Sequence, residues 1–283
     1  VCRQTLAKYY ALDEKSYNFG ESRARGRVFD EEEYRRIIIT ALENCRGRKN
    51  PLCVSSIYDV LKEKFGEKFL PGNEQTLRNF VKWLRETDQI TEKPKSFRPY
   101  DLVDTPPPGQ KMQLDFGQIA IENGIIIHFL VLLLMHSRFL HVVVQDHKFN
   151  TQETCAGILS GFKRFGGRVA TAVIDQDAVL IYEEKYGEII TTRMFEQFLA
   201  EQGMNLWVCR KADPQAKGPV ENSVKYVKTN YFSARVLRSL QEVSSGIISW
   251  CHRANNRLHR TTLKIPAEVL ELEAPHLLPL RNS

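Results

Sequence analysis

Apolar residues recur every three or four positions in three consecutive segments between residues 30 and 88, which predicts three short helices. Asp30, followed three residues later by Glu33, has the capping-box pattern of a helix start. The stretch from Gly66 to Gly72 is expected to form a turn before the third helix. The apolar positions are Tyr34, Ile37, Ile38, Ala41, Leu42 and Cys45, then Val54, Ile57, Tyr58, Leu61 and Phe65, then Leu77, Phe80, Val81 and Leu84.

The third of these helices carries a polar and basic face opposite its apolar one. Three short helices with such a third helix are typical of a helix-turn-helix unit, in which the third helix enters the major groove and its Arg and Asn side chains read base edges. Any small three-helix bundle also has one solvated face, so that alternative stays open. The candidate DNA contacts are Thr76, Arg78, Asn79, Lys82 and Arg85.

From Met112 onward the pattern changes to short apolar runs separated by turns, which predicts strands, and Asn123-Gly124 marks a hairpin turn. The order βββ-α-β-α-β-α-α is that of the ribonuclease H fold, an α/β fold whose mixed sheet carries helices on its faces. The expected strands are 112–121, 124–135, 138–145, 169–174 and 205–209. The expected helices are 151–165 capped by Thr151, one capped by Thr191 or Thr192, one beginning near Val220, and 241 to 257. Residues 176–190 are expected to be a polar insertion or a loop.

Three separated acids fall within this second pattern. Asp115 lies on an apolar strand between Leu114 and Phe116, where a carboxylate is costly unless it is paired or metal-bound. The alternative places Asp115 on a solvated strand face together with Gln113 and Gly117.

The second and third acids have weaker contexts of their own. Asp175 follows an apolar strand, where turn acids are common, and Asp177 is a rival two positions later on the same face. Glu221 opens a helix whose positive end favours an acid, and it shares a face with Lys225 and Lys228. Solvated ion pairing explains that face, and so does a helix that faces DNA. All three acids map to one corner of the expected fold.

Composition permits a nucleic-acid partner without requiring one. The chain has 283 residues, a net charge of +6 and 42% hydrophobic residues, which suits an ordinary globular chain of two or three domains. Its sequence pI is about 8.9. The six cysteines form no C-x-x-C pair, which argues against structural zinc and favours a reduced intracellular setting. The longest apolar run, Ile125 to Met135, is too short to span a bilayer.

Basic residues also occur in the two stretches that flank the helical segment. Residues 1–10 resemble the last helix of a DNA-reading unit, with Arg3 and Lys8 on one side of the helix. They fit an amphipathic helix packed on its own domain equally well. The proline-rich linker before residue 110 carries Lys93, Lys95 and Arg98, which could follow a DNA backbone or belong to a plain spacer.

The acids and their neighbours resemble the DDE triad of retroviral-integrase-like transposases. The matching motifs are Gln113-x-Asp115-Phe116-Gly117, then Asp175, then Lys217-Gly218-x-Val220-Glu221, and the likeness continues through Trp250, Asn255-Asn256, His259 and Pro266-Ala267-Glu268. Within this group, the match is closer to the IstA-type bacterial transposases. Their second motif often reads Asp-Asn, whereas here Asp175-Gln176 is followed by another acid, so Asp177 stays a rival while the motif frame favours Asp175.

The resemblance implies a domain order. Members of the family have a complete first helix-turn-helix and a C-terminal β-rich domain, so the chain is expected to be a fragment. The expected divisions are 1–28, the end of a truncated helix-turn-helix plus linker; 29–90, a helix-turn-helix DNA-binding domain; 91–110, a basic and proline-rich linker; 111–260, the ribonuclease H-like DDE catalytic core; and 261–283, an extension leading to an absent C-terminal domain.

The resemblance also implies a chemistry. Asp115, Asp175 and Glu221 would hold two Mg²⁺ ions, or Mn²⁺, about 4 Å apart, with Asp115 bridging both, so that water frees a 3′-hydroxyl which then attacks target DNA. The expected partners are transposon-end DNA, target DNA, an AAA+ helper ATPase of the IstB type and further copies of the chain in a dimer or tetramer. The expected location is the bacterial cytoplasm, at the nucleoid, with no membrane partner. Candidate phosphate contacts are Lys217, Lys225, Lys228, Arg253, Arg257 and Arg260.

Two other functions use the same residues. A ribonuclease H-like nuclease would hydrolyse DNA and stop before strand joining. A DNA-binding regulator would keep the helical unit and carry an inactive core, so that replacing Glu221 with Gln would leave its function unchanged.

Overall fold

The computed structural model describes residues 27–44, 53–87, 105–175, 180–185, 188–209, 223–259 and 261–281. The chain divides into two units, Val1–Pro94 and Lys95–Ser283, and each is described on its own. Among the described residues, no helix is both long enough and apolar enough to span a membrane.

The first unit contains the three expected helices, α3 (Glu32–Asn44), α4 (Val54–Phe65) and α5 (Glu74–Glu86). Their apolar stripes meet in one core, as their spacing predicts. The residues that are fully shielded from solvent include Phe29, Ile38, Ile57, Leu61, Leu77, Val81 and Leu84. The segment expected to be a simple turn contains a short 3₁₀ helix, η1 (Glu67–Phe69).

The predicted cap of the first helix is wrong. Helix α3 begins at Glu32, two residues after Asp30, and the Asp30 carboxylate instead accepts a hydrogen bond from the Arg35 guanidinium. The opposite charge of Arg35 competes with the helix N–H groups for this carboxylate, and sequence spacing does not show which of them wins. Helix α5, by contrast, has a true cap, because the side chain of Asn73 accepts from the backbone N–H of Thr76 at 2.9 Å.

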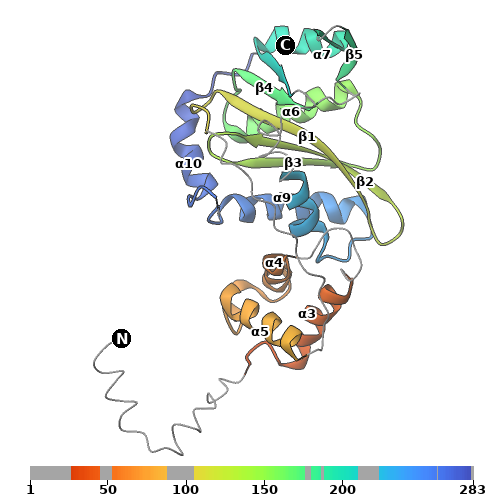
Figure 1. Ribbon diagram of the computed structural model, residues 1–283, viewed down its shortest axis with the longest axis vertical. Coiled ribbons are helices and arrows are strands. Elements are labelled where there is room, and N and C mark those ends of the chain that lie inside the picture. Colours follow the sequence, from red (N-terminus) through yellow and green to blue (C-terminus); the bar gives the residue numbers. More distant parts are fainter. Residues whose placement is uncertain are drawn as a thin grey trace, which may run out of the picture. The chain divides into compact units, whose positions relative to one another are not determined.

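The second unit is built on a five-stranded sheet in the order β3-β2-β1-β4-β7 (Figure 1). The first three strands pair antiparallel, and β4 and β7 run parallel to β1. This mixed topology, with helices on both faces, is the ribonuclease H-like fold that the order of elements predicts. The strands are β1 (Lys111–Ala120), β2 (Ile126–Leu134), β3 (Leu140–Gln145), β4 (Thr171–Ile174) and β7 (Asn205–Val208).

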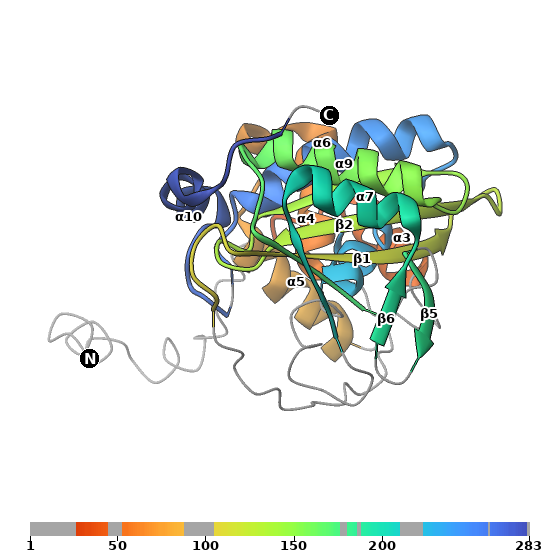
Figure 2. The ribbon, with the colours of Figure 1, turned by 90° about the horizontal axis from the view of Figure 1, so that it is seen from above.

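Alternation along the strands divides the core between two faces of the sheet. Leu130, Leu132 and Leu134 of β2 pack with helices α6 (Thr151–Phe165) and α7 (Arg193–Gln202), which lie side by side (Figure 2). The intervening residues Phe129, Val131 and Leu133 pack on the other face with η2 (Val227–Phe232) and α9 (Leu240–Asn255).

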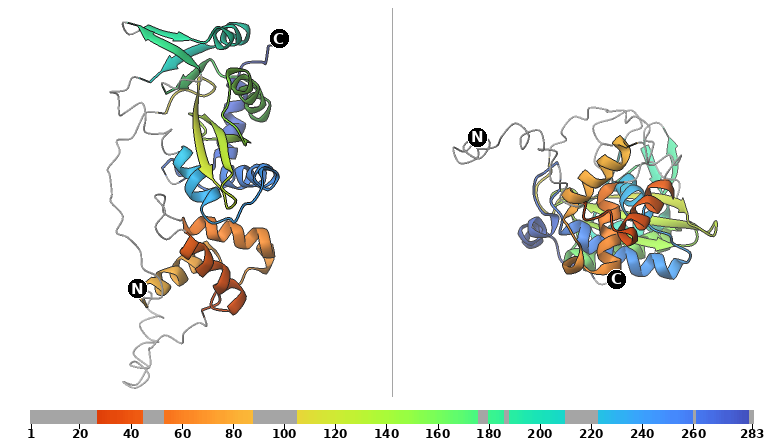
Figure 3. Two further views of the ribbon diagram at one scale, coloured as in Figure 1. Left: turned by 90° about the vertical axis from the view of Figure 1, so that its right-hand side faces the viewer. Right: turned by 90° about the horizontal axis from the view of Figure 1, so that it is seen from below.

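The segment expected to be an irregular polar loop contains a β-hairpin, so that prediction is wrong. Strands β5 (Ile181–Lys185) and β6 (Glu188–Thr191) pair antiparallel as a separate two-stranded sheet that leads into α7 (Figure 3). Paired glutamates and a lysine in this segment lower its intrinsic strand preference, which is why its sequence looks like a loop.

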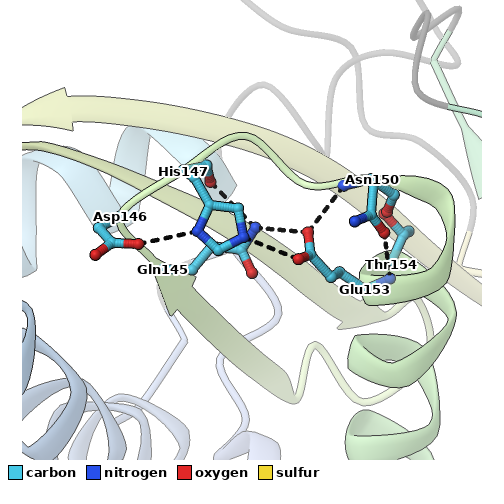
Figure 4. Close-up of polar contacts among 6 residues, drawn as sticks. All are labelled: Gln145, Asp146, His147, Asn150, Glu153 and Thr154. Carbon is cyan, nitrogen blue, oxygen red and sulfur yellow. Dashed lines mark hydrogen bonds and ion pairs between the residues drawn. The ribbon is translucent and has the colours of Figure 1, made fainter.

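The cap of α6 is Asn150 and not Thr151 as predicted. The Asn150 side chain accepts from the backbone N–H of Glu153, and the Glu153 carboxylate accepts from the Asn150 N–H, which forms a complete capping box (Figure 4). Thr151 is the first helical residue, and it accepts a hydrogen bond of 3.4 Å from the Thr192 hydroxyl. Thr192 is the N-cap of α7, as one of the two expected alternatives, although its side chain makes no capping bond.

The C-terminal residues pack against the start of the sheet. Helix α10 (Pro266–Glu273) is followed by η3 (Ala274–His276), and Leu278 exchanges backbone hydrogen bonds of 2.8 Å with Arg168. The fully buried carboxylate of Glu273 accepts from the backbone N–H groups of Gly109 at 2.9 Å and Ser137 at 3.0 Å. One side chain of α10 thereby ties together the residues that precede β1 and the turn that follows β2.

Candidate active site

The sheet places Asp115 and Asp175 next to each other. Strand β1 pairs parallel with β4 so that Leu114 lies opposite Ile174, and the next residue on each strand is one of the two acids. Neighbouring strands are about 4.7–4.9 Å apart. Leu114 and Ile174 belong to the core under α6 and α7, so by alternation both acids project from the opposite face. Two carboxylates distant in sequence therefore share one place on the sheet.

The face that carries Asp115 is not a solvated one. Gln113, two residues earlier, is only 2% exposed, and a side chain at Gly117 would meet the Phe129 ring at 2.2 Å. Asp115 itself is half-buried, and its Oδ1 accepts a hydrogen bond of 2.8 Å from the Phe116 N–H. The alternative of a solvated face shared by Gln113 and Gly117 is therefore wrong.

The helix that follows the third candidate acid is fixed to this same face. Residues 223–226 are α-helical and continue into the π-helix η2, whose Val227, Tyr231 and Phe232 pack with β2 residues on the face of Asp115. π-Helical segments are rare and occur frequently at functional sites. Glu221 lies two residues before the described start of this helix and outside the described residues.

Helix α9 anchors the π-helical segment through buried polar bonds. The Trp250 indole N–H donates to Asn230 Oδ1 at 2.7 Å, and the Tyr231 hydroxyl donates to the Val243 carbonyl at 3.0 Å. Trp250, Asn230 and Tyr231 are completely buried. These bonds fix the rotation of the helix about its axis, and so they decide which side chains face the sheet.

The donor chemistry at Asp115 and Asp175 suits a hard divalent cation. Carboxylate oxygens are the ligands that Mg²⁺ and Mn²⁺ prefer, and two carboxylates at adjacent strand positions repel each other less when a cation lies between them. The described residues contain no group of three acidic, histidine or cysteine side chains that could hold an ion by itself. Glu221, which the sequence predicts as the third ligand, and the rival Asp177 both lie outside the described residues.

Nucleophilic side-chain chemistry is not favoured at two buried thiols and two imidazoles of this unit. Burial raises the pKa of Cys251 to about 12 and that of Cys155 to about 11, so both thiols stay protonated. Burial lowers the pKa of His141 to about 4, and its Nε2 lies 3.2 Å from the Ser160 hydroxyl on α6, away from the two acids. Burial also lowers the pKa of His259, whose Nδ1 accepts from the Thr262 N–H at 3.2 Å, which is a structural role.

The comparisons with known proteins point to one family. The chain is 33% identical over 235 residues to the transposase of an IS21-like insertion sequence element from Bacteroides fragilis, covering 81% of this chain and 45% of that protein. It is 28% identical over 181 residues to the transposase of insertion sequence element IS21 from Pseudomonas aeruginosa, covering 62% of this chain and 46% of that one. The chain resembles the IS21-type transposases. No protein-family model matches it.

The solved structures agree on the fold. A chain in the cryo-EM structure of the simian T-cell lymphotropic virus intasome in complex with PP2A regulatory subunit B56 gamma aligns with a TM-score of 0.50 at 13% identity, covering 82% of this chain and 78% of that one. At that identity the likeness concerns the fold alone. The chain spans about half the length of the IS21-type transposases it matches.

Two of the candidate phosphate contacts lie on the helix after the third acid, and their surroundings differ. Lys225 is exposed, whereas Lys228 is half-buried with its Nζ 5.9 Å from the Phe129 ring centroid. The prediction of one shared face assumes regular α-helical spacing, which the change to π-helical geometry between them alters. Arg253 on α9 and Arg257 after it are half-buried and have interaction partners.

The candidate DNA contacts of the helical unit lie on α5, as predicted from their spacing. Asn79 and Lys82 are exposed, while Thr76, Arg78 and Arg85 are half-buried. Arg78 forms an ion pair with Glu74 one turn earlier, and Lys82 Nζ is 3.5 Å from Glu86. Asn79 Oδ1 accepts from Gln75 at 3.1 Å. Each polar side chain is thus held within the helix by a neighbour, and DNA contact by this face stays a prediction.

The remaining candidates lie outside the described residues. These are Arg3, Lys8, Lys93, Lys95, Arg98, Lys217, Glu221 and Arg260, together with the rival acid Asp177. Sequence reasoning missed Asn230, the buried acceptor that anchors the π-helical segment. A polar residue between the apolar Val227 and Tyr231 is its only sequence signal, and any solvated position would give the same signal.

Proposed function

We propose that this chain contributes the catalytic core and a DNA-binding unit of an IS21-type transposase, which cleaves at the ends of an insertion sequence and joins the freed 3′-hydroxyls to target DNA. The observation that carries the proposal is the register that brings Asp115 beside Asp175 on the face covered by the η2 helix. Sequence similarity to transposases of IS21-type elements supports it.

The proposed metal ligands are Asp115, Asp175 and Glu221, which would hold two Mg²⁺ ions, with Mn²⁺ as a substitute. When bound, such a pair supplies Lewis-acid stabilisation of the oxygens that attack and leave the phosphorus. The protein positions the acids. Strand pairing fixes Asp115 and Asp175, and the bond from Trp250 to Asn230 holds the helix that follows Glu221 against the same face.

The proposed partners follow from that reaction. Transposon ends and target DNA are substrates at the bacterial nucleoid, two ends require a dimer or tetramer, and an AAA+ ATPase of the IstB type would assist. The helical unit would bind end DNA through α5, where exposed Asn79 and Lys82 offer a base-reading amide and a phosphate-binding cation. The divisions at residues 28, 90, 110 and 260 remain part of this proposal.

The test is a strand-joining assay with this chain, labelled insertion-sequence ends, target plasmid and Mg²⁺. We expect joined products from the wild type and none from Asp115→Asn or Glu221→Gln, with DNA binding retained in a gel shift. Asp146→Asn is the matched control, because Asp146 is an exposed aspartate whose partner is His147 and not the acid pair. Free ends without joined products would identify a nuclease, and full function of Glu221→Gln would identify a regulator with an inactive core.

A further inference from the structure

An exposed tryptophan and a lysine lie beside the acid pair on the same face of the sheet. The ammonium of Lys111 on β1 stands 3.8 Å from the centre of the Trp207 ring on β7, and Trp207 is 49% exposed. Such a contact across three strands is possible only when both side chains project from one face. Because large aromatic rings usually find cover, a half-exposed indole held by a cation invites a functional explanation.

The strand register shows where this pair lies relative to the acids. Lys111, Gln113 and Asp115 alternate onto one face of β1, and the paired positions place Trp207 in the same row as Gln113 and Val173. The next row along that face contains Asp115 and Asp175. At a rise of about 3.3 Å per residue and a strand spacing of about 4.8 Å, the Trp207 backbone is roughly 8 Å from that of Asp175.

This position addresses an electrostatic difficulty of the site. A pair of carboxylates repels the phosphates of any DNA strand that approaches it, and the repulsion extends over a Debye length of about 8 Å at physiological ionic strength. Lys111 lies about four residues, or roughly 13 Å, from Asp115 along the same strand face, outside that range, so its cation can attract a more distant phosphate of the same DNA strand. Its ammonium has three N–H donors, so it can face the indole and still bind a phosphate oxygen.

We propose that Lys111 and Trp207 form a platform for a single DNA strand next to the acid pair, with Lys111 bound to a phosphate and Trp207 packed against a base or sugar. The platform would position the strand whose phosphodiester lies at Asp115 and Asp175. This inference rests on the proposed function, since it takes DNA as the substrate. Base–aromatic stacking tolerates any sequence, which suits a site that must accept varied target DNA.

The test uses a short single-stranded DNA oligonucleotide in buffer with EDTA, so that binding is measured without cleavage. By fluorescence anisotropy we expect Trp207→Ala to weaken binding about 5- to 150-fold, as loss of one stacked base predicts, and Trp207→Phe to retain most of the affinity. Lys111→Met should reduce the slope of log affinity against log salt by about 0.7. Met194→Ala is the matched control, because Met194 is 51% exposed and lies on α7, which packs on the opposite face.

A second readout reports contact directly. The chain has three tryptophans, of which Trp250 is completely buried, so in a Trp83→Phe background quenching by the oligonucleotide reports on Trp207. We expect quenching that the further change Trp207→Phe removes. Unaltered affinity in Trp207→Ala, or no quenching, overturns the platform. If Trp207→Ala loses self-association but keeps its DNA affinity, the platform is also overturned, because the edge strand β7 would then bind a second copy of the chain.

The two proposals fail separately. If Trp207→Ala weakens oligonucleotide binding but the wild type neither cleaves nor joins DNA, the platform is supported and the proposed function is contradicted. If the wild type cleaves and joins DNA but Trp207→Ala binds the oligonucleotide as tightly as Met194→Ala does, the function is supported and the platform is contradicted.

Discussion

Replacing Glu273 should destabilise the unit that contains the acid pair more than any surface change. Its carboxylate is completely buried and accepts backbone hydrogen bonds from Gly109 at 2.9 Å and Ser137 at 3.0 Å. Gly109 lies two residues before the start of β1, the strand that carries Asp115, and it has a positive φ of 70°. A side chain at Gly109 would meet the His276 carbonyl oxygen at 2.3 Å, so the C-terminal residues are packed tightly against it.

Two opposing effects decide the magnitude. Each hydrogen bond to a charged group contributes about 1.5–3 kcal/mol, so Glu273→Ala loses about 3–6 kcal/mol and leaves two buried N–H groups without their acceptor. Removal of a buried carboxylate also relieves a desolvation cost, which can make such replacements neutral when apolar groups of matching shape fill the space. Alanine does not fill it, and the N–H groups remain, so the loss dominates. For a unit of this size the Tm should fall by about 6–24 °C.

Differential scanning calorimetry of the full chain measures this change. Glu271→Ala is the matched control, since Glu271 is an exposed glutamate of the same helix, and its effect should stay within about 0.5 kcal/mol. The Tm of Glu273→Gln should lie between those of Glu273→Ala and Glu271→Ala, because the amide keeps one acceptor oxygen but places an NH₂ donor near the other backbone N–H. A Tm for Glu273→Ala equal to that of Glu271→Ala would refute the reasoning.

Three further changes test other parts of the molecule. Trp250→Phe removes the buried N–H that donates at 2.7 Å to a buried amide oxygen, and it should lower the free energy of unfolding by about 1–3 kcal/mol in urea titration; no loss would mean that this bond does not hold the π-helical segment. Mg²⁺ that binds the folded chain should raise the Tm of the wild type but not that of Asp115→Asn. An equal rise in both would contradict the assignment of Asp115 as a metal ligand. The His147 pKa is raised by its hydrogen bonds to Asp146 and then Glu153, so its stabilising effect is complete below the ordinary histidine pKa and is lost as pH rises through the raised one. The Tm difference between wild type and His147→Gln should therefore shrink as the pH rises above the ordinary histidine pKa of about 6.5, and a constant difference would contradict the assignment.

Local patterns predicted the elements well and their ends less well. The apolar stripe of α5 and the three antiparallel strands are confirmed, because a periodic pattern in sequence becomes a buried face. The cap at Asp30 was wrong because the Arg35 guanidinium competes with the helix N–H groups for its carboxylate, and the cap at Thr151 was wrong because the neighbouring Asn150 side chain accepts from the helix N–H instead. The β5–β6 hairpin was missed because its charged residues resemble those of a loop.

The sequence by itself determined the two kinds of unit, the strand that carries Asp115 and the position of Asp175 after an apolar run, because these follow from local spacing and burial of apolar surface. Only the tertiary structure decided that the two acids share one row of the sheet, that η2 packs on the same face, and that Lys111 meets Trp207 across β4. Each of these depends on which strands pair and in what register. A shift of one residue in that pairing would send every side chain to the opposite face, and no local pattern records it.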